Sequence, residues 1–306
     1  MITKGSEFTM SKVIMLIGLP GSGKTSYAKK LVSEMRDRDD WKICSSDGVR
    51  RKLYGDESVQ GNPNTVFEHL HKEVKECLSN NINVIYDATN VSRKNRKNLI
   101  QICKSLGVEI KAHIVWATID ECIIRDKNRE RSVGQSIIIK FANRFEVPDL
   151  DEGFSEIHVE FTTGIDVSEY LSSLLTKMHI SQDNSHHSLT VYKHCEKACD
   201  YLFSESYIIR QAAFLHDIGK PFCKSFKRGD LNAHYYNHDN IGAYLVMPIL
   251  KSPQYTEFFS KENLLFIIWL INNHMQPYFH SKYYNGLTGE KRVLLNKLHE
   301  ADKAAH

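Results

Sequence analysis

Short apolar segments alternate with amphipathic segments along the first half of the chain. Four apolar segments have the length and composition of buried strands; they are KVIMLIG (12–18), the beginning of WKICSSD (41–47), NVIYD (83–87) and KAHIVWA (111–117). Apolar residues at helical spacing are found between them, at 24–36, 64–80, 92–106 and 119–130. Strands that alternate with helices form a parallel sheet with helices on both faces. We therefore predict an α/β domain.

The pattern changes near IHVEF (157–161), and helical spacing then dominates to the end of the chain. The predicted helices are 166–178, 189–203, 206–217, 238–250, 261–275 and 290–304. The polar stretch DNSHHS (183–188) has the composition of a loop, so the domain boundary is placed between Thr162 and Ser185. The predicted organisation is an α/β domain at 10–162, a linker and first helix at 163–184, and an all-α domain at 185–306. Residues 1–9 precede a second methionine and are interpreted as an expression scar.

Composition adds three constraints. A chain of 306 residues with 42% hydrophobic and 25% charged residues has room for two globular domains. No apolar run reaches the roughly 18 residues that span a bilayer, and seven cysteines without a CxxC pair indicate a reducing cytoplasm. Eleven of the fifteen histidines lie from His179 onward, which places metal or acid–base chemistry in the second half. The net charge of +3 means that nucleic-acid binding must rest on local patches.

GLPGSGKT (18–25) has the spacing G-x-x-x-x-G-K-[ST], directly after a predicted strand and at the start of a predicted helix. The backbone N–H groups of Gly21, Ser22 and Gly23 are expected to surround an anion, and Lys24 to reach the β- and γ-phosphates. The hydroxyl of Thr25 is a ligand for Mg²⁺. The segment therefore predicts a site for ATP or another NTP with Mg²⁺.

Residues for the phosphate acceptor are expected at the ends of the next two strands. Asp47 is placed to accept a proton from an attacking hydroxyl, and Arg50 to hold a substrate phosphate. The alternative is a helix N-cap at Asp47 and a solvated Arg50. Asp87, which ends the third strand in YDATN (86–90), is the candidate for orienting Mg²⁺ or its waters, with a turn aspartate as the alternative.

The stretch RDKNRER (125–131) places Arg125 and Arg129 four residues apart on one predicted helix face, with Arg131 just beyond. Two guanidinium groups on one face can clamp a transferring phosphoryl group. The alternative is an ordinary solvated helix.

Together these motifs, with FEVPDLDEGFSEI (145–157), resemble the 5′-hydroxyl polynucleotide kinase module of phage and bacterial end-healing enzymes. The resemblance covers about residues 12–160. It implies that Asp47 is the general base, that Arg50 contacts the acceptor phosphate, and that Arg125 and Arg129 are lid residues on the NTP phosphates. One departure is Gly134, where such lids commonly have proline after valine.

AFLHDIGKP (213–221) contains adjacent metal-liking side chains, His216 and Asp217, in an otherwise apolar helix. A buried aspartate is costly unless it is paired or metal-bound. Further candidate ligands lie on other predicted helices, as a metal site inside a helical bundle requires; they are His194, His238, His274 and Asp302. The alternative is a set of core histidines without a ligand.

This pattern resembles the HD phosphohydrolase superfamily over about residues 185–304. The resemblance implies that His194, His216, Asp217 and Asp302 hold one metal, and that His238 and His274, with Asp217 bridging, hold a second. The expected cofactor is a divalent transition metal such as Mn²⁺, Ni²⁺, Co²⁺, Cu²⁺ or Zn²⁺, which lowers the pKa of bound water toward about 7.

Four further groups have predicted roles near this site. Lys220 is expected to hold a phosphate oxygen, and His186 and His187 to approach the substrate, against the alternative of a plain loop. KSFKRGD (224–230) and the aromatic residues Tyr235, Tyr236, Tyr278 and Phe279 have the residue types of a basic, stacking rim for nucleotides. Taken singly, each is explained by a solvated loop or a core aromatic.

One module that adds phosphate and one that removes it suggest repair of RNA or DNA ends. The combination resembles HD–polynucleotide kinase end-healing enzymes with the module order reversed. The hypothesis is a 5′-hydroxyl polynucleotide kinase joined to a metal-dependent 2′,3′-phosphoesterase. Sealing of the healed ends would need a separate ligase, and no membrane association is expected. The alternatives are a small-molecule or nucleoside kinase fused to an HD nucleotidase, and an NTP-sensing module with an HD ligand-binding domain.

Overall fold

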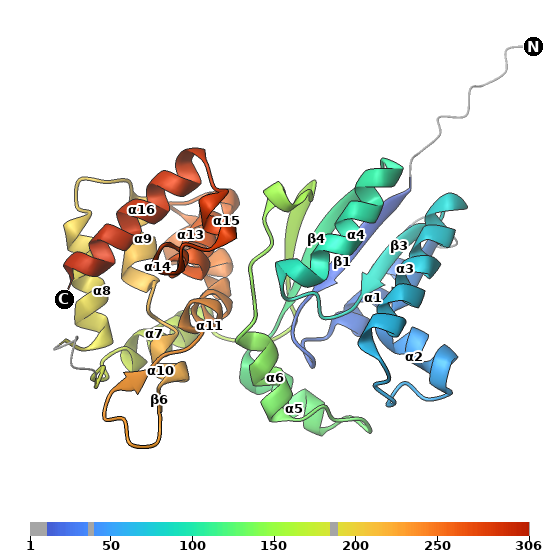
Figure 1. Cartoon of the computed structure of the whole chain (residues 1–306), viewed down its shortest axis with the longest axis horizontal. Coiled ribbons are helices and arrows are strands. Elements are labelled where there is room, and N and C mark those ends of the chain that lie inside the picture. The colour runs from blue at the N-terminus through green and yellow to red at the C-terminus, as the bar shows by residue number, and fades with distance from the viewer. Residues whose placement is uncertain (1–10, 36–39, 184–188, 306) are drawn as a thin grey trace, which may run out of the picture. The chain divides into compact units, whose positions relative to one another are not determined.

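The computed structural model describes residues 11–35, 40–183 and 189–305 (Figure 1). The chain forms two compact units. The first contains the residues up to Ile139 together with Pro148–Thr163, and the second contains Lys140–Val147 together with the residues from Gly164 onward. Among the described helices, none is both long enough and apolar enough to cross a membrane.

The first unit is built on a five-stranded parallel sheet in the order β2-β3-β1-β4-β5. The strands are β1 (Lys12–Ile17), β2 (Trp41–Ser45), β3 (Asn83–Asp87), β4 (Glu109–Trp116) and β5 (Glu156–Phe161). Its helices are α1 (Lys24–Glu34), α2 (Ser46–Tyr54), α3 (Pro63–Ser79), α4 (Arg93–Leu106) and α5 (Ile119–Lys127), with α6 (Gln135–Ala142) at its edge. The predicted α/β class is confirmed (Figure 1).

Strand register brings the candidate residues to one edge of the sheet. Leu16 of β1 lies beside Asp87 of β3, and Ser45 of β2 lies on the other side of Asp87. The loop after β1 and the start of α2 therefore meet at the carboxyl edge, where ligands bind in open parallel sheets.

The second unit is a bundle of helices around a shared core (Figure 1). Its larger helices are α7 (Val167–Lys177), α8 (Val191–Tyr201), α9 (Tyr207–Leu215), α11 (His238–Leu245), α13 (Lys261–Asn273) and α16 (Gly289–Ala304). Shorter helical turns are α10 (Lys220–Cys223), η3 (Met247–Lys251), α12 (Pro253–Thr256), α14 (Gln276–Phe279) and α15 (Lys282–Asn285). The helical class predicted for this half is confirmed.

Three local predictions need correction. The second unit is not wholly helical, because β6 (Ser225–Phe226) and β7 (Ala233–His234) form an antiparallel pair. The helix predicted at 238–250 changes to a 3₁₀ helix after Val246, where Pro248 cannot donate the hydrogen bond of a regular turn. The helix predicted at 119–130 ends at Lys127, so Arg129 lies beyond it.

Residues 140–147 pack within the second unit, although the residues before and after them in the sequence belong to the first unit. Phe145 is fully buried and meets Tyr244 edge-on, with ring centroids 5.2 Å apart. Asn272 accepts a hydrogen bond from Val147 N at 2.8 Å and donates to Phe145 O at 3.1 Å. The helical unit therefore includes a strap from the middle of the chain, which a single boundary near residue 163 does not describe.

Candidate active sites

The loop between β1 and α1 requires glycine at two positions. Gly21 and Gly23 have φ values of 84° and 92°, in the left-handed region that favours glycine. A Cβ on Gly21 would also lie 2.3 Å from Cys122 O. The loop therefore curls tightly into the N-terminus of α1, where backbone N–H groups and the helix dipole favour a phosphate.

Lys24, the first residue of α1, is folded back against this loop. Its Nζ donates to Gly18 O at 3.0 Å and to Leu19 O at 2.7 Å. Burial lowers the pKa of Lys24, and the nearby Asp87 carboxylate opposes that effect. The ammonium group is thus held beside the position that the loop offers to an anion.

Thr25 and Asp87 form the oxygen pair expected for Mg²⁺. Thr25 Oγ1 donates to Asp87 Oδ2 at 2.8 Å. Asp87 ends β3 and is only 7% exposed, so the alternative of a turn aspartate is wrong. Burial raises the pKa of Asp87, and Lys24 acts in the opposite direction. A hydroxyl and a carboxylate at this spacing suit a hard cation that prefers oxygen ligands, so these residues fit Mg²⁺.

Asp47 stands at the start of α2 with two arginines against one oxygen. Asp47 Oδ1 lies 2.7 Å from Arg50 Nη1 and 3.4 Å from Arg131 Nη1. The N-cap of α2 is Ser45, whose Oγ accepts from Gly48 N, so Asp47 is not the cap. The Arg50 side chain is 12% exposed, so the alternative of a solvated arginine is also wrong. The second carboxylate oxygen remains accessible, since the Asp47 side chain is 55% exposed.

Arg125 and Arg129 do not share a helix face as predicted. Because α5 ends at Lys127, Arg129 extends from the turn that follows it. Both side chains nevertheless line a cavity of about 460 Å³ together with Gly21 and Gly23. Arg129 is also close enough to Lys24 to act on it electrostatically.

Arg125 is held in place before any phosphate is bound. Its Nε donates to Glu121 Oε1 at 2.8 Å, and its Nη2 donates to Thr162 O at 2.7 Å. It is therefore not the solvated residue of the alternative interpretation, and its role on the NTP remains a prediction.

Asp126 fixes the turn after α5 that carries Arg129 and Arg131. The sequence pattern did not single out this aspartate. It is 1% exposed and accepts hydrogen bonds from Ser132 Oγ at 2.6 Å, Val133 N at 3.0 Å and Gly134 N at 2.9 Å. A proline at position 134 has no N–H to donate, and Gly134 has a φ of 88°. The departure at Gly134 therefore has a local structural reason.

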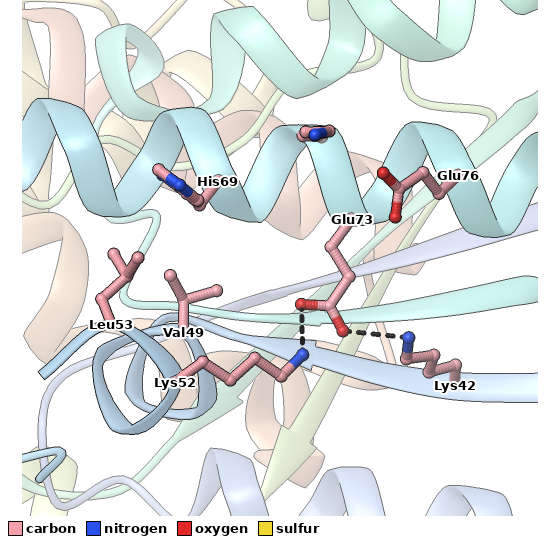
Figure 2. Close-up of a pocket in the computed structure, with 8 residues that line it drawn as sticks. Lys42, Val49, Lys52, Leu53, His69, Glu73 and Glu76 are labelled. Atoms are coloured by element: carbon pink, nitrogen blue, oxygen red, sulfur yellow. Dashed lines mark hydrogen bonds and ion pairs between the residues drawn. The ribbon is translucent and has the colours of Figure 1, made fainter. Parts of the chain in front are cut away.

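A second cavity, of about 260 Å³, lies between α2, α3 and β2 (Figure 2). Figure 2 shows the ammonium groups of Lys42 and Lys52 directed at Glu73, at 3.0 Å and 2.9 Å. One half-buried carboxylate thus pairs with both lysines, and the described P-loop residues do not line this cavity. The P-loop edge, and not this cavity, is the candidate phosphotransfer site.

In the second unit, four predicted ligands converge from the helices α8 and α16 and from the turn after α9. His194, His216 and Asp217 are at most 1% exposed, and Asp302 of α16 is 8% exposed. His194 Nε2 lies 2.9 Å from Asp302 Oδ1 and 3.4 Å from Asp217 Oδ2. One ligand atom from each of the four lies within 4.8 Å of the others, a spacing that one ion can occupy.

A second group shares Asp217. His238 Nε2 and His274 Nε2 lie 3.1 Å and 3.7 Å from Asp217 Oδ1, and 3.0 Å from each other. Asp217 thus offers one oxygen to each group, as a bridging carboxylate between two cations would. The predicted set of six ligands is assembled in the folded chain.

Backbone carbonyls orient three of the imidazoles. The Nδ1 atoms of His216, His238 and His274 lie 2.7, 2.6 and 2.7 Å from the carbonyl oxygens of Ala213, Tyr235 and Ile271. Each Nδ1–H can donate to its carbonyl, which directs Nε2 toward the cluster. This is the arrangement that prepares histidine to bind a metal.

Unsatisfied polar atoms test whether these residues fit a cation. Within the described parts of the chain, His216 Nε2 is buried without a hydrogen-bond partner, and Asp217 Oδ2 has no hydrogen bond apart from its 2.6 Å ion pair with Lys220. Burial, followed by the adjacent His238, lowers the pKa of His274 to about 3, so this imidazole is neutral and able to ligate. Buried polar atoms of this kind are costly without a partner, so the cluster fits a divalent metal better than a core without a ligand.

Lys220 is buried beside the cluster and is committed to Asp217. Its Nζ lies 2.6 Å from Asp217 Oδ2 and donates to Gln182 Oε1 at 2.8 Å. Burial raises the pKa of Asp217, but the charges of His216 and Lys220 outweigh it and hold that pKa well below its usual range. Contact between Lys220 and a phosphate oxygen remains a prediction.

Two neighbours of the cluster have contacts that sequence spacing does not reveal. Tyr278 donates its hydroxyl to Asp302 Oδ2 at 2.9 Å, and Gln182 is fully buried against Lys220. Tyr278 therefore orients a predicted metal ligand, whereas the sequence placed it in a stacking rim. His186 and His187 lie outside the described residues.

Comparison with known families agrees with this division of the chain. Residues 13–148 match the AAA_33 family model, described as an AAA domain, and residues 184–303 match the model of the HD domain. The chain is a P-loop kinase domain followed by an HD domain. A P-loop domain implies a nucleotide with Mg²⁺. Its HD domain implies a divalent metal at the histidine–aspartate cluster.

Individual relatives of this kinase–HD chain are distant. The L-seryl-tRNA(Sec) kinase of Methanococcus maripaludis is 25% identical over 171 residues, which are 53% of this chain and 64% of the relative. This chain thus spans less than two thirds of that relative's length. A chain in the structure of the Pnkp1/Rnl/Hen1 RNA repair complex is 25% identical, over 46% of this chain and 45% of that one, with a TM-score of 0.39.

A chain of the PezAT toxin–antitoxin system of Streptococcus pneumoniae is 18% identical, over 52% of this chain and 72% of that one. Its TM-score is also 0.39. TM-scores this low do not establish a shared fold.

Proposed function

We propose that this chain heals broken nucleic-acid ends. Its kinase domain phosphorylates 5′-hydroxyl ends with an NTP, and its HD domain removes a 2′,3′-cyclic or terminal phosphate. The observation that carries the proposal is the presence, in one chain, of a P-loop with an accessible carboxylate beside it and of a buried six-residue metal cluster. A broken strand with a 5′-hydroxyl and a blocked 3′ end needs both reactions.

In the kinase reaction, Asp47 removes the proton of the acceptor hydroxyl. The acceptor oxygen then bonds to the γ-phosphorus, the bond to the β-phosphate oxygen breaks, and the nucleoside diphosphate leaves. Arg50 and Arg131 fix the Asp47 carboxylate through one oxygen and leave the other for the incoming hydroxyl. Lys24 and Arg129 offset negative charge on the transferred group.

An RNA-borne acceptor is supported by one relative. The L-seryl-tRNA(Sec) kinase, by its name, acts on a group carried by a tRNA. A hydroxyl at an RNA end is a related acceptor, since the nucleic acid contributes binding and the hydroxyl contributes the nucleophile.

In the HD reaction, a bound divalent metal supplies hydroxide at neutral pH by lowering the pKa of its water. Asp217 contributes one oxygen to each ligand group and holds the two groups together. His194 and Asp302 complete one group, and the carbonyl-oriented His238 and His274 complete the other. Burial of all six side chains excludes bulk water from the reacting phosphate.

The kinase assignment is tested with Lys24→Ala and Asp47→Asn. Loss of the general base is expected to slow phosphorylation of a 5′-hydroxyl oligonucleotide by about 10²- to 10⁴-fold, with unchanged phosphate removal. Asp56→Asn, which alters another carboxylate near α2, is the matched control. Efficient phosphorylation of free nucleosides, without any use of oligonucleotide ends, would refute this half of the proposal.

The HD assignment is tested with Asp217→Asn, which removes charge from both ligand groups. This variant is expected to lose hydrolysis of a 2′,3′-cyclic phosphate end and to keep full kinase activity. Asp200→Asn, at the exposed end of α8, is the control. Esterase activity that survives both chelation and Asp217→Asn would contradict the assignment.

A further inference from the structure

The β6–β7 hairpin carries large apolar side chains that the fold leaves in solvent. Phe226 is 55% exposed, Leu231 92% and Tyr236 56%. Lys227 and Arg228 in the connecting turn are exposed as well. The hairpin extends from the helical unit as the orange loop near α10 (Figure 1). Two short strands are marginally stable alone, and exposed aromatic residues beside cations indicate a function other than core formation.

One face of the hairpin combines the aromatic and basic groups. Ser225 and His234 are paired across the two strands, so their side chains lie on the same face of the hairpin. The rings of His234 and Tyr236 are stacked, with centroids 5.5 Å apart and planes 5° from parallel. Lys227 Nζ lies 5.4 Å from the centroid of the Tyr236 ring. A flat ring beside an exposed cation suits a base and a neighbouring phosphate.

The base of the hairpin contacts residues of the histidine–aspartate cluster and its neighbour Lys220. Tyr235 lies between His234 and Tyr236, its ring centroid is 5.5 Å from Lys220 Nζ, and its carbonyl lies 2.6 Å from His238 Nδ1. Ala233 N donates to Asp183 O at 2.8 Å, and Lys224 Nζ donates to Ser181 O at 2.8 Å. The exposed face therefore begins at the edge of the candidate phosphoesterase site.

We propose that the β6–β7 hairpin is a binding arm for single-stranded nucleic acid. A base stacks on the His234–Tyr236 pair, and Lys227 and Arg228 contact the phosphates of the strand whose 3′ end enters the HD site. A single strand fits better than a duplex, because only unpaired bases offer a free face for stacking on side chains. The inference rests on the proposed function, since it assumes that the HD substrate is a polynucleotide end.

Binding by the full-length protein tests the arm without any catalysis. The probe is a fluorescent single-stranded RNA with phosphates at both ends, in the presence of chelator, so that it offers neither an acceptor hydroxyl nor a hydrolysable complex. Tyr236→Ala is expected to weaken binding about tenfold, the effect of one lost base–aromatic stack. Lys227→Ala and Arg228→Ala are each expected to reduce the slope of log K against log salt by about 0.7.

Matched controls remove an equally exposed tyrosine and lysine elsewhere in the same unit. Tyr207, which is 70% exposed, and Lys261 at the start of α13 serve this purpose, and their alanine variants are expected to bind like wild type. Unchanged binding in Tyr236→Ala, Lys227→Ala and Arg228→Ala would overturn the proposal. An equal loss in the control variants, which would point to a general surface effect, would also overturn it.

Hydrolysis assays separate this proposal from the proposed function. With a 2′,3′-cyclic mononucleotide, the hairpin variants are expected to match wild type, whereas with an oligonucleotide their KM is expected to rise about tenfold. If the wild-type protein hydrolyses neither substrate, the proposed function is refuted. The binding assay then still tests whether the hairpin binds single-stranded nucleic acid. Equal KM values for wild type and Tyr236→Ala on the oligonucleotide would contradict the proposal that the hairpin binds the strand.

Discussion

Arg96 is a fully buried arginine in the P-loop kinase domain, and replacing it with alanine is expected to destabilise that domain strongly. Its Nε and Nη2 donate to the two carboxylate oxygens of Glu152 at 2.8 Å and 2.6 Å. Its Nη1 also donates to Asn90 O at 3.2 Å. Arg96→Ala would remove both close hydrogen bonds from the Glu152 carboxylate, whose side chain is only 12% exposed, and leave Arg93 at 4.0 Å as its remaining guanidinium partner.

Removing one partner of a buried ion pair costs about 3–5 kcal/mol. For a domain of this size each kcal/mol lowers Tm by roughly 2–4 °C, so the expected decrease is about 6–20 °C. Lys111→Ala is the control, because Lys111 and Glu156 also approach to 2.6 Å but are 31% and 49% exposed. An exposed pair is worth only about 0–1 kcal/mol. Thermal unfolding followed by circular dichroism measures both variants, and similar decreases in Tm would refute the claim that burial determines the difference.

Two further predictions concern charge and metal. Burial raises the pKa of Asp126, but hydrogen bonds from Ser132, Gly134 and Val133 outweigh burial, so the net pKa is lowered. The ionised carboxylate therefore stabilises the fold fully above the unfolded pKa of about 3.9, and this stabilisation is lost as pH falls through the lowered folded pKa. Asp126→Asn should therefore unfold more easily than wild type in urea at pH 7, with a difference that shrinks below about pH 4; a constant difference would contradict this. Adding Mn²⁺ to chelator-treated protein should stabilise the HD domain by about 2.7 kcal/mol at a hundredfold excess over Kd, and a calorimetric shift that Asp217→Asn retains in full would contradict the metal assignment.

The two candidate sites were predictable because the residue types that suit their chemistry stand out in the sequence. GLPGSGKT fixes a turn and the first residues of a helix, and the structure places Lys24 and Thr25 at that turn. The six metal candidates were found by residue type and by their places on separate helices, and folding brings them within ligand distance of one another. In both cases the side chains can be identified from the sequence, and the helices and strands that carry them determine where they point.

Other contacts depend on tertiary packing that local sequence does not encode. Arg96 and Glu152 are 56 residues apart, and neither lies in a recognisable motif. Asn272 binds the backbone of a strap 125 residues earlier, which apolar periodicity cannot reveal. The helix α2 is absent from the helices predicted by apolar spacing, and the Ser45 cap and the buried Val49 stabilise it. The two cations on Asp47 become visible only when Arg131 is placed across from α2.

The central claim is that one chain adds phosphate to one end of a broken strand and removes it from the other. The direct measurement incubates wild-type protein with ATP, Mg²⁺, Mn²⁺ and RNA that carries a 5′-hydroxyl and a 2′,3′-cyclic phosphate, and then identifies both ends of the product. The account predicts a 5′-phosphate and an opened or dephosphorylated 3′ end. It also predicts that Asp47→Asn blocks only the first change and Asp217→Asn only the second. RNA recovered with both ends unaltered, while free nucleosides and mononucleotides are converted efficiently, would contradict it.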